Sequence, residues 1–135
     1  MPATYEIDVA RRLVLSHGWG VFTEQDLLGH YTRLSMDPDF QPTFSQLADL
    51  RAVERAELRK EFLRRHALEN LFDRYARRAV VVSSAEHYEL ARIYAEFAQY
   101  APNNVHVFRD MHDAEEWLGL TTAQMKTING GSHAR

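Results

Sequence analysis

Six residues of this 135-residue sequence have side chains suited to holding an anion or a polar group, and they stand at the carboxyl ends of expected strands. They form three pairs along the chain: Asp49 with Arg51, Ser83 with Ser84, and Arg109 with Asp110. Ligands of open α/β sheets bind outside the carboxyl ends of parallel strands. We therefore expect these side chains to converge on a contact site for an anionic or polar ligand, or for a partner.

An arginine-rich stretch, residues 51–78, is a second candidate. It holds nine of the sixteen Lys and Arg residues and only five of the nineteen Asp and Glu residues. Arg64, Arg65, Arg77 and Arg78 are candidates for a basic, phosphate-binding surface. A solvated helix face, on which arginine stems cover apolar neighbours, explains the same residues. We favour that second interpretation, because interleaved glutamates dilute the positive field.

The motifs of nucleotide-binding and metal enzymes do not occur in the sequence. There is no GxGxxG and no GxxxxGK[ST], so we expect no nucleotide cofactor. The seven histidines show no HxH, HxxxH or HExxH spacing, and we expect no metal. The lack of cysteine excludes a thiol nucleophile and disulfides.

A hydrolase is also not indicated. Ser83 and Ser84 lack the flanking glycines of a nucleophile elbow, and a capping box between Ser83 and Glu86 explains Ser83 without catalysis. The enzyme alternative therefore rests on Asp49, His106 or Ser83 in acid–base or nucleophilic roles, and it requires two of them within hydrogen-bond reach.

The elements that must position these residues follow from hydrophobic periodicity, capping signals and breakers. We expect strands at 5–9, 13–17, 44–50, 79–82 and 105–108, and helices at 23–36, 54–78, from 83 to the break at Pro102, and from Asp110 or His112 to Leu118. Two glycines around Trp19 are expected to end the second strand. The order β-β-α-β-α-β-α-β-α predicts an α/β fold with a single mixed, mostly parallel sheet of about five strands, flanked by helices.

Composition places these elements in one ordinary globular domain. The chain is 45% hydrophobic and 26% charged, with a net charge of −3. We expect a domain at 1–120 and a polar tail at 121–135. The acidic balance argues against a nucleic-acid partner, and we expect no transmembrane segment or signal peptide, and a cytoplasmic protein.

Several short segments, taken in order, carry a family resemblance. They are Tyr5-Glu6-Ile7-Asp8, Gly18, Thr23-Glu24-Gln25-Asp26, residues 37–42 (DPDFQP), Ala48-Asp49-Leu50, residues 79–82 (AVVV), residues 88–92 (YELAR), residues 107–110 (VFRD) and Glu116-Trp117-Leu118. Together they resemble the small bacterial STAS-like proteins, relatives of the sporulation anti-sigma factor antagonist. The resemblance covers roughly residues 4–120.

The resemblance implies a mixed sheet with flanking helices, no established enzymatic activity, and a role as a protein-interaction switch. In some relatives a serine at the start of the helix after the third strand is phosphorylated. We place that junction at residues 49–52, which read Asp-Leu-Arg-Ala, so this switch does not carry over. The related CRAL-TRIO lipid-binding fold keeps an apolar ligand in consideration by analogy.

Three functions follow from these observations. The leading hypothesis is a non-enzymatic regulatory or protein-interaction domain, with self-association as one form. The alternative is a binding module for a small apolar or amphipathic ligand, to which the plentiful aromatic residues would contribute a pocket. An enzyme of unknown reaction is the third.

Overall fold

In the computed structural model, which describes residues 2–69, 71–101 and 103–120, five strands form one sheet in their chain order, β1-β2-β3-β4-β5. The strands are β1 (Ala3–Asp8), β2 (Leu13–Thr23), β3 (Ser45–Glu57), β4 (Arg77–Val81) and β5 (Asn104–Phe108). β1 runs antiparallel to β2, and the other three pairings are parallel. The predicted mixed, mostly parallel sheet is therefore confirmed.

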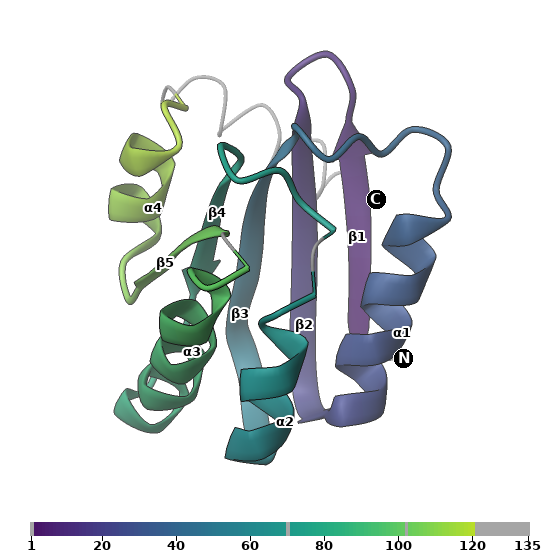
Figure 1. Ribbon diagram of the computed structural model, residues 1–135. Coiled ribbons are helices and arrows are strands. Elements are labelled where there is room, and N and C mark those ends of the chain that lie inside the picture. The colour runs from purple at the N-terminus through teal and green to yellow at the C-terminus, as the bar shows by residue number, and fades with distance from the viewer. Residues whose placement is uncertain (1, 70, 102, 121–135) are drawn as a thin grey trace.

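Four helices cover the two faces unequally. The helices α1 (Glu24–Ser35), α2 (Lys60–His66) and α3 (Ala85–Ala98) lie across one face, and α4 (Met111–Trp117) packs on the other beside β4 and β5 (Figure 1). The predicted order of strands and helices is confirmed. In the described part of the chain, no helix is long and apolar enough to cross a membrane.

Alternate strand residues divide the core between these faces, because successive side chains of a strand point to opposite sides. Leu47 of β3 packs in a cluster with Ala114 of α4. Its neighbours Gln46 and Ala48 point to the other face, where they line a cavity beneath α1, α2 and α3. A second cluster on that side contains Val14, Leu34, Phe44, Phe72 and Ala76.

Two helices begin at the caps that the sequence predicts. The Thr23 hydroxyl accepts from the Asp26 N–H, and the Asp26 carboxylate accepts from the Thr23 N–H at 2.8 Å, which completes a capping box at α1. Asp110 accepts from the backbone N–H groups of His112 and Asp113 at the start of α4.

The prediction that the glycines around Trp19 end the second strand is wrong. They let the strand bend instead. β2 continues to Thr23 with irregularities between His17 and Trp19 and between Gly20 and Val21. A Cβ on Gly18 would lie 2.8 Å from the Leu50 side chain, and Gly20 has a φ of +62°, which favours glycine. These glycines therefore permit two bulges inside a long strand.

The predicted helix at 54–78 is wrong over most of its length. β3 runs on to Glu57 in parallel with β2, and Val53 packs there with Phe22 and Ala3. Among the described residues of that range, helix is found in Lys60–His66 alone, and Arg77 and Arg78 already belong to β4. Val53 and Ala56 are three residues apart, a spacing that also fits a helix, and pairing with β2 outweighs this local helix propensity.

The expected capping box between Ser83 and Glu86 is wrong, because the N-cap is the next residue and makes a single capping hydrogen bond. Ser84 is the N-cap of α3, and its hydroxyl accepts from the His87 N–H at 3.1 Å. Ser83 lies before the helix, because the Val82 N–H still bonds to the Phe108 carbonyl and extends the sheet by one residue. The predicted tail at 121–135 lies outside the described residues.

Candidate functional site

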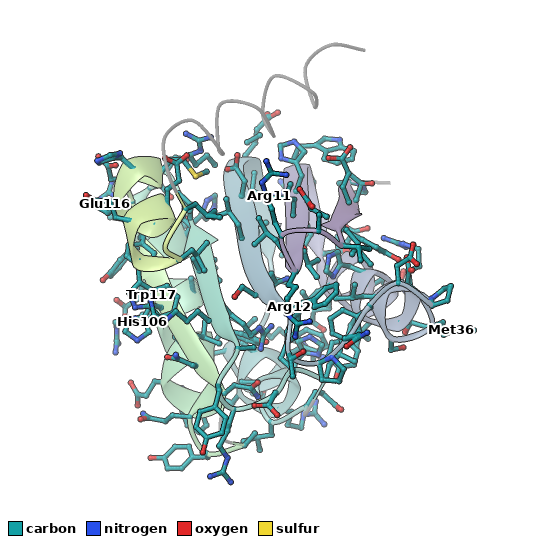
Figure 2. All side chains as sticks on the ribbon, turned by 90° about the horizontal axis from the view of Figure 1, so that it is seen from above. Arg11, Arg12, Met36, His106, Glu116 and Trp117 are labelled. Carbon is teal, nitrogen blue, oxygen red and sulfur yellow. The ribbon has the colours of Figure 1, made fainter. Side chains whose placement is uncertain are left out.

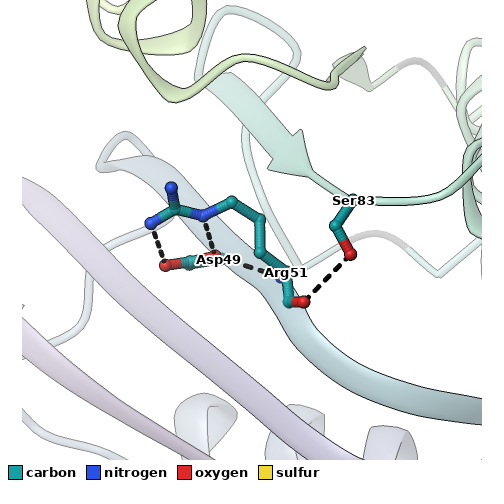
Figure 3. A network of polar contacts seen from close by, with 3 residues as sticks. All are labelled: Asp49, Arg51 and Ser83. Carbon is teal, nitrogen blue, oxygen red and sulfur yellow. Dashed lines mark hydrogen bonds and ion pairs between the residues drawn. The ribbon is translucent and has the colours of Figure 1, made fainter.

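Four of the six predicted residues lie together: Ser83 and Arg109 follow the carboxyl ends of β4 and β5, whereas Asp49 and Arg51 lie within β3, which continues to Glu57. Arg51 donates from Nε and Nη2 to the two carboxylate oxygens of Asp49, each at 2.9 Å (Figure 3). The Ser83 hydroxyl donates to the Arg51 carbonyl at 3.0 Å, and Arg109 donates to the Ser83 carbonyl at 3.3 Å. The convergence expected from parallel strands therefore occurs.

These groups mainly bind one another. Burial raises the pKa of Asp49, but the side-chain and backbone hydrogen bonds from Arg51 outweigh it and hold that pKa below its usual value. The other two predicted residues, Ser84 and Asp110, are occupied as the N-caps of α3 and α4. The arrangement ties the ends of β4 and β5 to the middle of β3 through hydrogen bonds within the protein.

The four arginines proposed as a basic surface do not form one. The Arg64 guanidinium lies 5.6 Å from the centre of the Phe97 ring, and Arg65 is exposed in the last turn of α2. Arg77 donates to the Trp117 carbonyl on the α4 face. Arg78 points to the opposite face and is buried, with 8% of its surface exposed, so its assignment to the surface is wrong. Adjacent strand residues face opposite ways, which separates Arg77 from Arg78.

The residues of the enzyme alternative do not bond to one another: Asp49 and Ser83 both bond to Arg51, and His106 makes a separate contact. His106 of β5 stacks on Trp117 of α4, with ring centres 4.3 Å apart (Figure 2). Within 2–69, 71–101 and 103–120, no hydrogen bond joins any two of Asp49, Ser83 and His106. Throughout the described part of the chain, no three histidine or acidic side chains are placed to hold a metal ion.

A cavity of about 130 Å³ lies between the sheet and helices α1, α2 and α3. Its apolar lining comes from the sheet, the helices and the segments between them: Ala3, Phe22, Leu27, Leu34, Ala48, Leu50, Val53, Ala56, Leu58, Leu63, Leu71, Phe72, Val80, Val82, Leu90 and Ala91. Its polar lining consists of Ser16, His17, His30, Tyr31, Gln46, His66, Arg78, His87 and Tyr94. An apolar lining with a few placed polar groups is typical of small-molecule sites, although the volume is below the roughly 300 Å³ at which pockets for drug-sized ligands begin.

Five of the polar residues form a continuous hydrogen-bonded chain along this cavity. Arg78 donates to the Tyr94 hydroxyl at 2.9 Å and to the Gln46 carbonyl oxygen at 3.1 Å. The Gln46 amide donates to the Ser16 hydroxyl at 3.0 Å, and Ser16 Oγ lies 2.9 Å from His30 Nε2. A hydroxyl can take part in more than one hydrogen bond, so Ser16 joins Gln46 to His30 in one chain.

Two buried histidines of this site, His30 and His66, are held neutral. Burial, assisted by the positive charges of Arg33 and Arg78, lowers the pKa of His30 to about 4. Burial and Arg78 lower the pKa of His66 to about 4 as well. At neutral pH the imidazoles therefore contribute polar atoms but no charge.

An aromatic wall surrounds His66 on the helix side of the cavity. Its ring stacks on Phe62 at 5.6 Å and meets the edge of Tyr31 at 5.1 Å. Tyr94 lies 6.0 Å away, and its hydroxyl is the one that accepts from Arg78. The wall therefore joins the apolar surface to the polar chain.

Sequence reasoning missed this site, although a signal was present. Ser16, Gln46 and Arg78 occupy inward positions on three adjacent strands, where neighbours such as Val14 and Val80 are apolar. A polar residue on the helix-covered face of each of these strands departs from the pattern in which inward-facing residues are apolar. The predicted fourth strand begins at residue 79 and the predicted helix ends at Arg78, so the sequence pattern does not place Arg78 on a strand beside Gln46.

Comparisons with known proteins bear on the fold. The chain matches no protein-family model and no curated protein. It does match the crystal structure of an uncharacterized protein of the DUF3478 family from Shewanella loihica PV-4, described as having a SpoIIAA-like fold. The TM-score is 0.57 at 17% identity, over 86% of this chain and 93% of the other. This chain has a SpoIIAA-like fold. The predicted STAS-like resemblance is confirmed at the level of the fold.

The SpoIIAA-like fold also relocates the junction at which some STAS-like relatives carry a phosphorylated serine. The helix after the third strand is α2, and its N-cap is Arg59 rather than a residue of 49–52. Arg59 donates from its backbone and side chain to Glu24, which ties the start of α2 to the start of α1. Neither Leu58, Arg59 nor Lys60 carries a hydroxyl group.

Proposed function

We propose that this protein is a binding module for a small, largely apolar ligand, the second of the three functions that the sequence left open. The observation that carries the proposal is the cavity of about 130 Å³ beneath α1, α2 and α3. The ligand would lie among the apolar side chains of the sheet and helices, with the buried polar chain fixing its orientation.

The size of the cavity supports binding over imperfect packing. Protein interiors are close-packed, and voids larger than a water molecule are few. A cavity of roughly 150 Å³ in another protein holds benzene. The present cavity is of that size, so we expect a ligand with about one ring or a short branched chain.

Filling the cavity should abolish binding while the fold persists. Ala48 lies on the cavity side of β3, paired with Ser16 and Val80. We expect Ala48→Ile to weaken binding of benzyl alcohol or indole about tenfold or more, because the added carbons occupy the space of the ring. Isothermal titration calorimetry, with native mass spectrometry of freshly purified protein, measures the effect.

The matched control is Ala52→Ile, an exposed position on the same strand. This variant should bind as the wild type does. A wild type that carries no bound molecule and binds no ring-sized probe would contradict the proposed function.

A second candidate is the regulatory or protein-interaction domain that the sequence favoured, including self-association. Two apolar side chains near the end of β2 support it: Trp19 is 37% exposed and stacks on His17, and Val21 is 44% exposed. If the chain self-associates through them, light scattering of the wild type will give a dimer mass, and Trp19→Ser will give a monomer. A monomeric wild type at high concentration would count against this candidate.

Both candidates are binding functions rather than enzymatic ones. Asp49, Arg51 and Ser83 form hydrogen bonds with one another, which supports a structural role for this group. A cytoplasmic location stays part of the proposal.

A further inference from the structure

We infer that the ligand of this cavity is a small apolar carboxylate of about the size of benzoate, and that the Arg78 guanidinium binds its carboxylate group. The inference rests on the proposed function and names the chemical class of the ligand. It begins from an arginine whose charge has no acidic partner.

Arg78 is a buried cation with no acidic partner in the described ranges. Only 8% of its surface is exposed, and none of the ion pairs between described residues involves it. No aspartate or glutamate is among the residues that line the cavity. Buried charges in proteins are ordinarily paired, so this guanidinium is suited to an external anion.

The hydrogen bonds of Arg78 leave part of its donor set available. A guanidinium has five N–H groups. The described contacts use one on Nε, toward Gln46, and one on Nη2, toward Tyr94. Phe72 lies against it with the ring centre 4.3 Å from the guanidinium carbon, which stabilises the charge but supplies no carboxylate. The remaining N–H groups can form the forked pair that arginine makes with a carboxylate.

Arg78 is the arginine of the cavity lining, and two of the lining histidines add no charge to it near neutral pH. His30 and His66 are neutral there, since burial holds the pKa of each at about 4. A single positive charge matches a monoanion, whereas a phosphate dianion would bring an unbalanced negative charge into an apolar chamber. This favours a carboxylate over a phosphate.

His87 gives a separate sign that a polar ligand group is missing. It lines the cavity with 9% of its surface exposed, and its Nδ1 has no hydrogen-bond partner. Buried polar atoms are seldom left without a partner. A bound ligand that carries oxygen atoms can supply one.

The apolar body of the ligand follows from the rest of the lining. Leu50, Leu63 and Val53 supply aliphatic surface, and the aromatic wall around His66 supplies ring faces. Together with the volume of about 130 Å³, these groups suit one ring rather than a long acyl chain.

The test compares three ligands of one shape on the full chain at about pH 7, where benzoate is ionised. Benzoate carries the anion, benzyl alcohol is the neutral analogue and benzylamine is the cationic one. We expect calorimetry to show benzoate binding about 10- to 100-fold more tightly than benzyl alcohol, and benzylamine binding most weakly. Amide NMR shifts at Ser16, Gln46 and Tyr94 place the bound molecule in the cavity.

Variants at Arg78 identify the group that recognises the anion. In Arg78→Met the preference for benzoate should vanish while benzyl alcohol still binds. Arg78→Lys keeps the charge without the forked geometry, and we expect it to retain part of the preference. The control is Arg65→Met, which removes an exposed arginine from α2 and should leave the preference unchanged.

The outcomes separate the inference from the function on which it rests. Equal affinity for benzoate and benzyl alcohol overturns the carboxylate inference and leaves the binding module standing. An undiminished preference in Arg78→Met overturns the role of Arg78. Failure of all three ligands to bind contradicts the proposed function itself. If Arg78→Met does not fold, Arg78→Lys and the three-ligand comparison on the wild type still decide the question.

Discussion

Acidification from about pH 6.5 to about pH 4 will destabilise the folded protein by several kcal/mol, because two buried histidines resist protonation. Burial lowers the pKa of His30 and His66 from 6.5 to about 4. Below pH 6.5 the unfolded chain takes up protons that the folded chain does not, so the free energy of unfolding decreases as the pH falls. Each histidine contributes on the order of 3 kcal/mol over this window.

Urea unfolding at a series of pH values measures this dependence. His66→Gln should reduce the slope between about pH 6.5 and pH 4.5 by roughly half, because one of the two titrating groups is gone. His112→Gln is the control, since that side chain is 65% exposed and should leave the slope unchanged. A free energy of unfolding that stays constant across the window would contradict neutral burial of these histidines.

Phe44→Ala will lower the free energy of unfolding by about 3–5 kcal/mol, the usual cost of removing a fully buried phenylalanine. Phe44 is 1% exposed and packs in a cluster with Val14, Leu34 and Phe72. Its backbone N–H bonds to the Gln41 carbonyl at 2.9 Å, so Phe44 sits at the turn that leads into β3.

Chemical denaturation followed by circular dichroism measures this loss. Val9→Ala is the matched control, because Val9 is 54% exposed and its truncation should change the free energy by no more than about 0.5 kcal/mol. A loss below about 1 kcal/mol in Phe44→Ala would show that the cluster does not depend on this ring.

Much of the fold could be predicted from local signals. The order of the nine elements, the cap at Thr23 and the strand at Ala79 followed from periodicity and capping residues, and the structure confirms them. The end of β3 could not be predicted in this way. Its residues Glu54 to Glu57 favour a helix locally, and only pairing with β2 makes them a strand.

The site was predicted in part, for a related reason. Ser83 and Arg109 do converge, because the chain order fixes where β4 and β5 finish, and Asp49 lies beside them although β3 continues to Glu57. Whether their polar atoms are free depends on side-chain geometry that spacing does not encode. The prediction that Arg78 lies on the surface has the same cause as the wrong helix at 54–78. In a strand, Arg77 and Arg78 point to opposite faces of the sheet, and a helix does not separate neighbours in this way.

The order of the strands has a consequence for how the chain reaches this fold. Each strand pairs with the one that precedes it in the sequence, and no strand is inserted between two earlier ones. The sheet can therefore grow from the β1–β2 hairpin by adding one strand at a time, as the chain leaves the ribosome. Each addition joins segments that are near neighbours in sequence, which limits the entropy lost in closing each connection. The cavity would be completed late in synthesis, because α3, which supplies Tyr94, is the last of its helices to emerge.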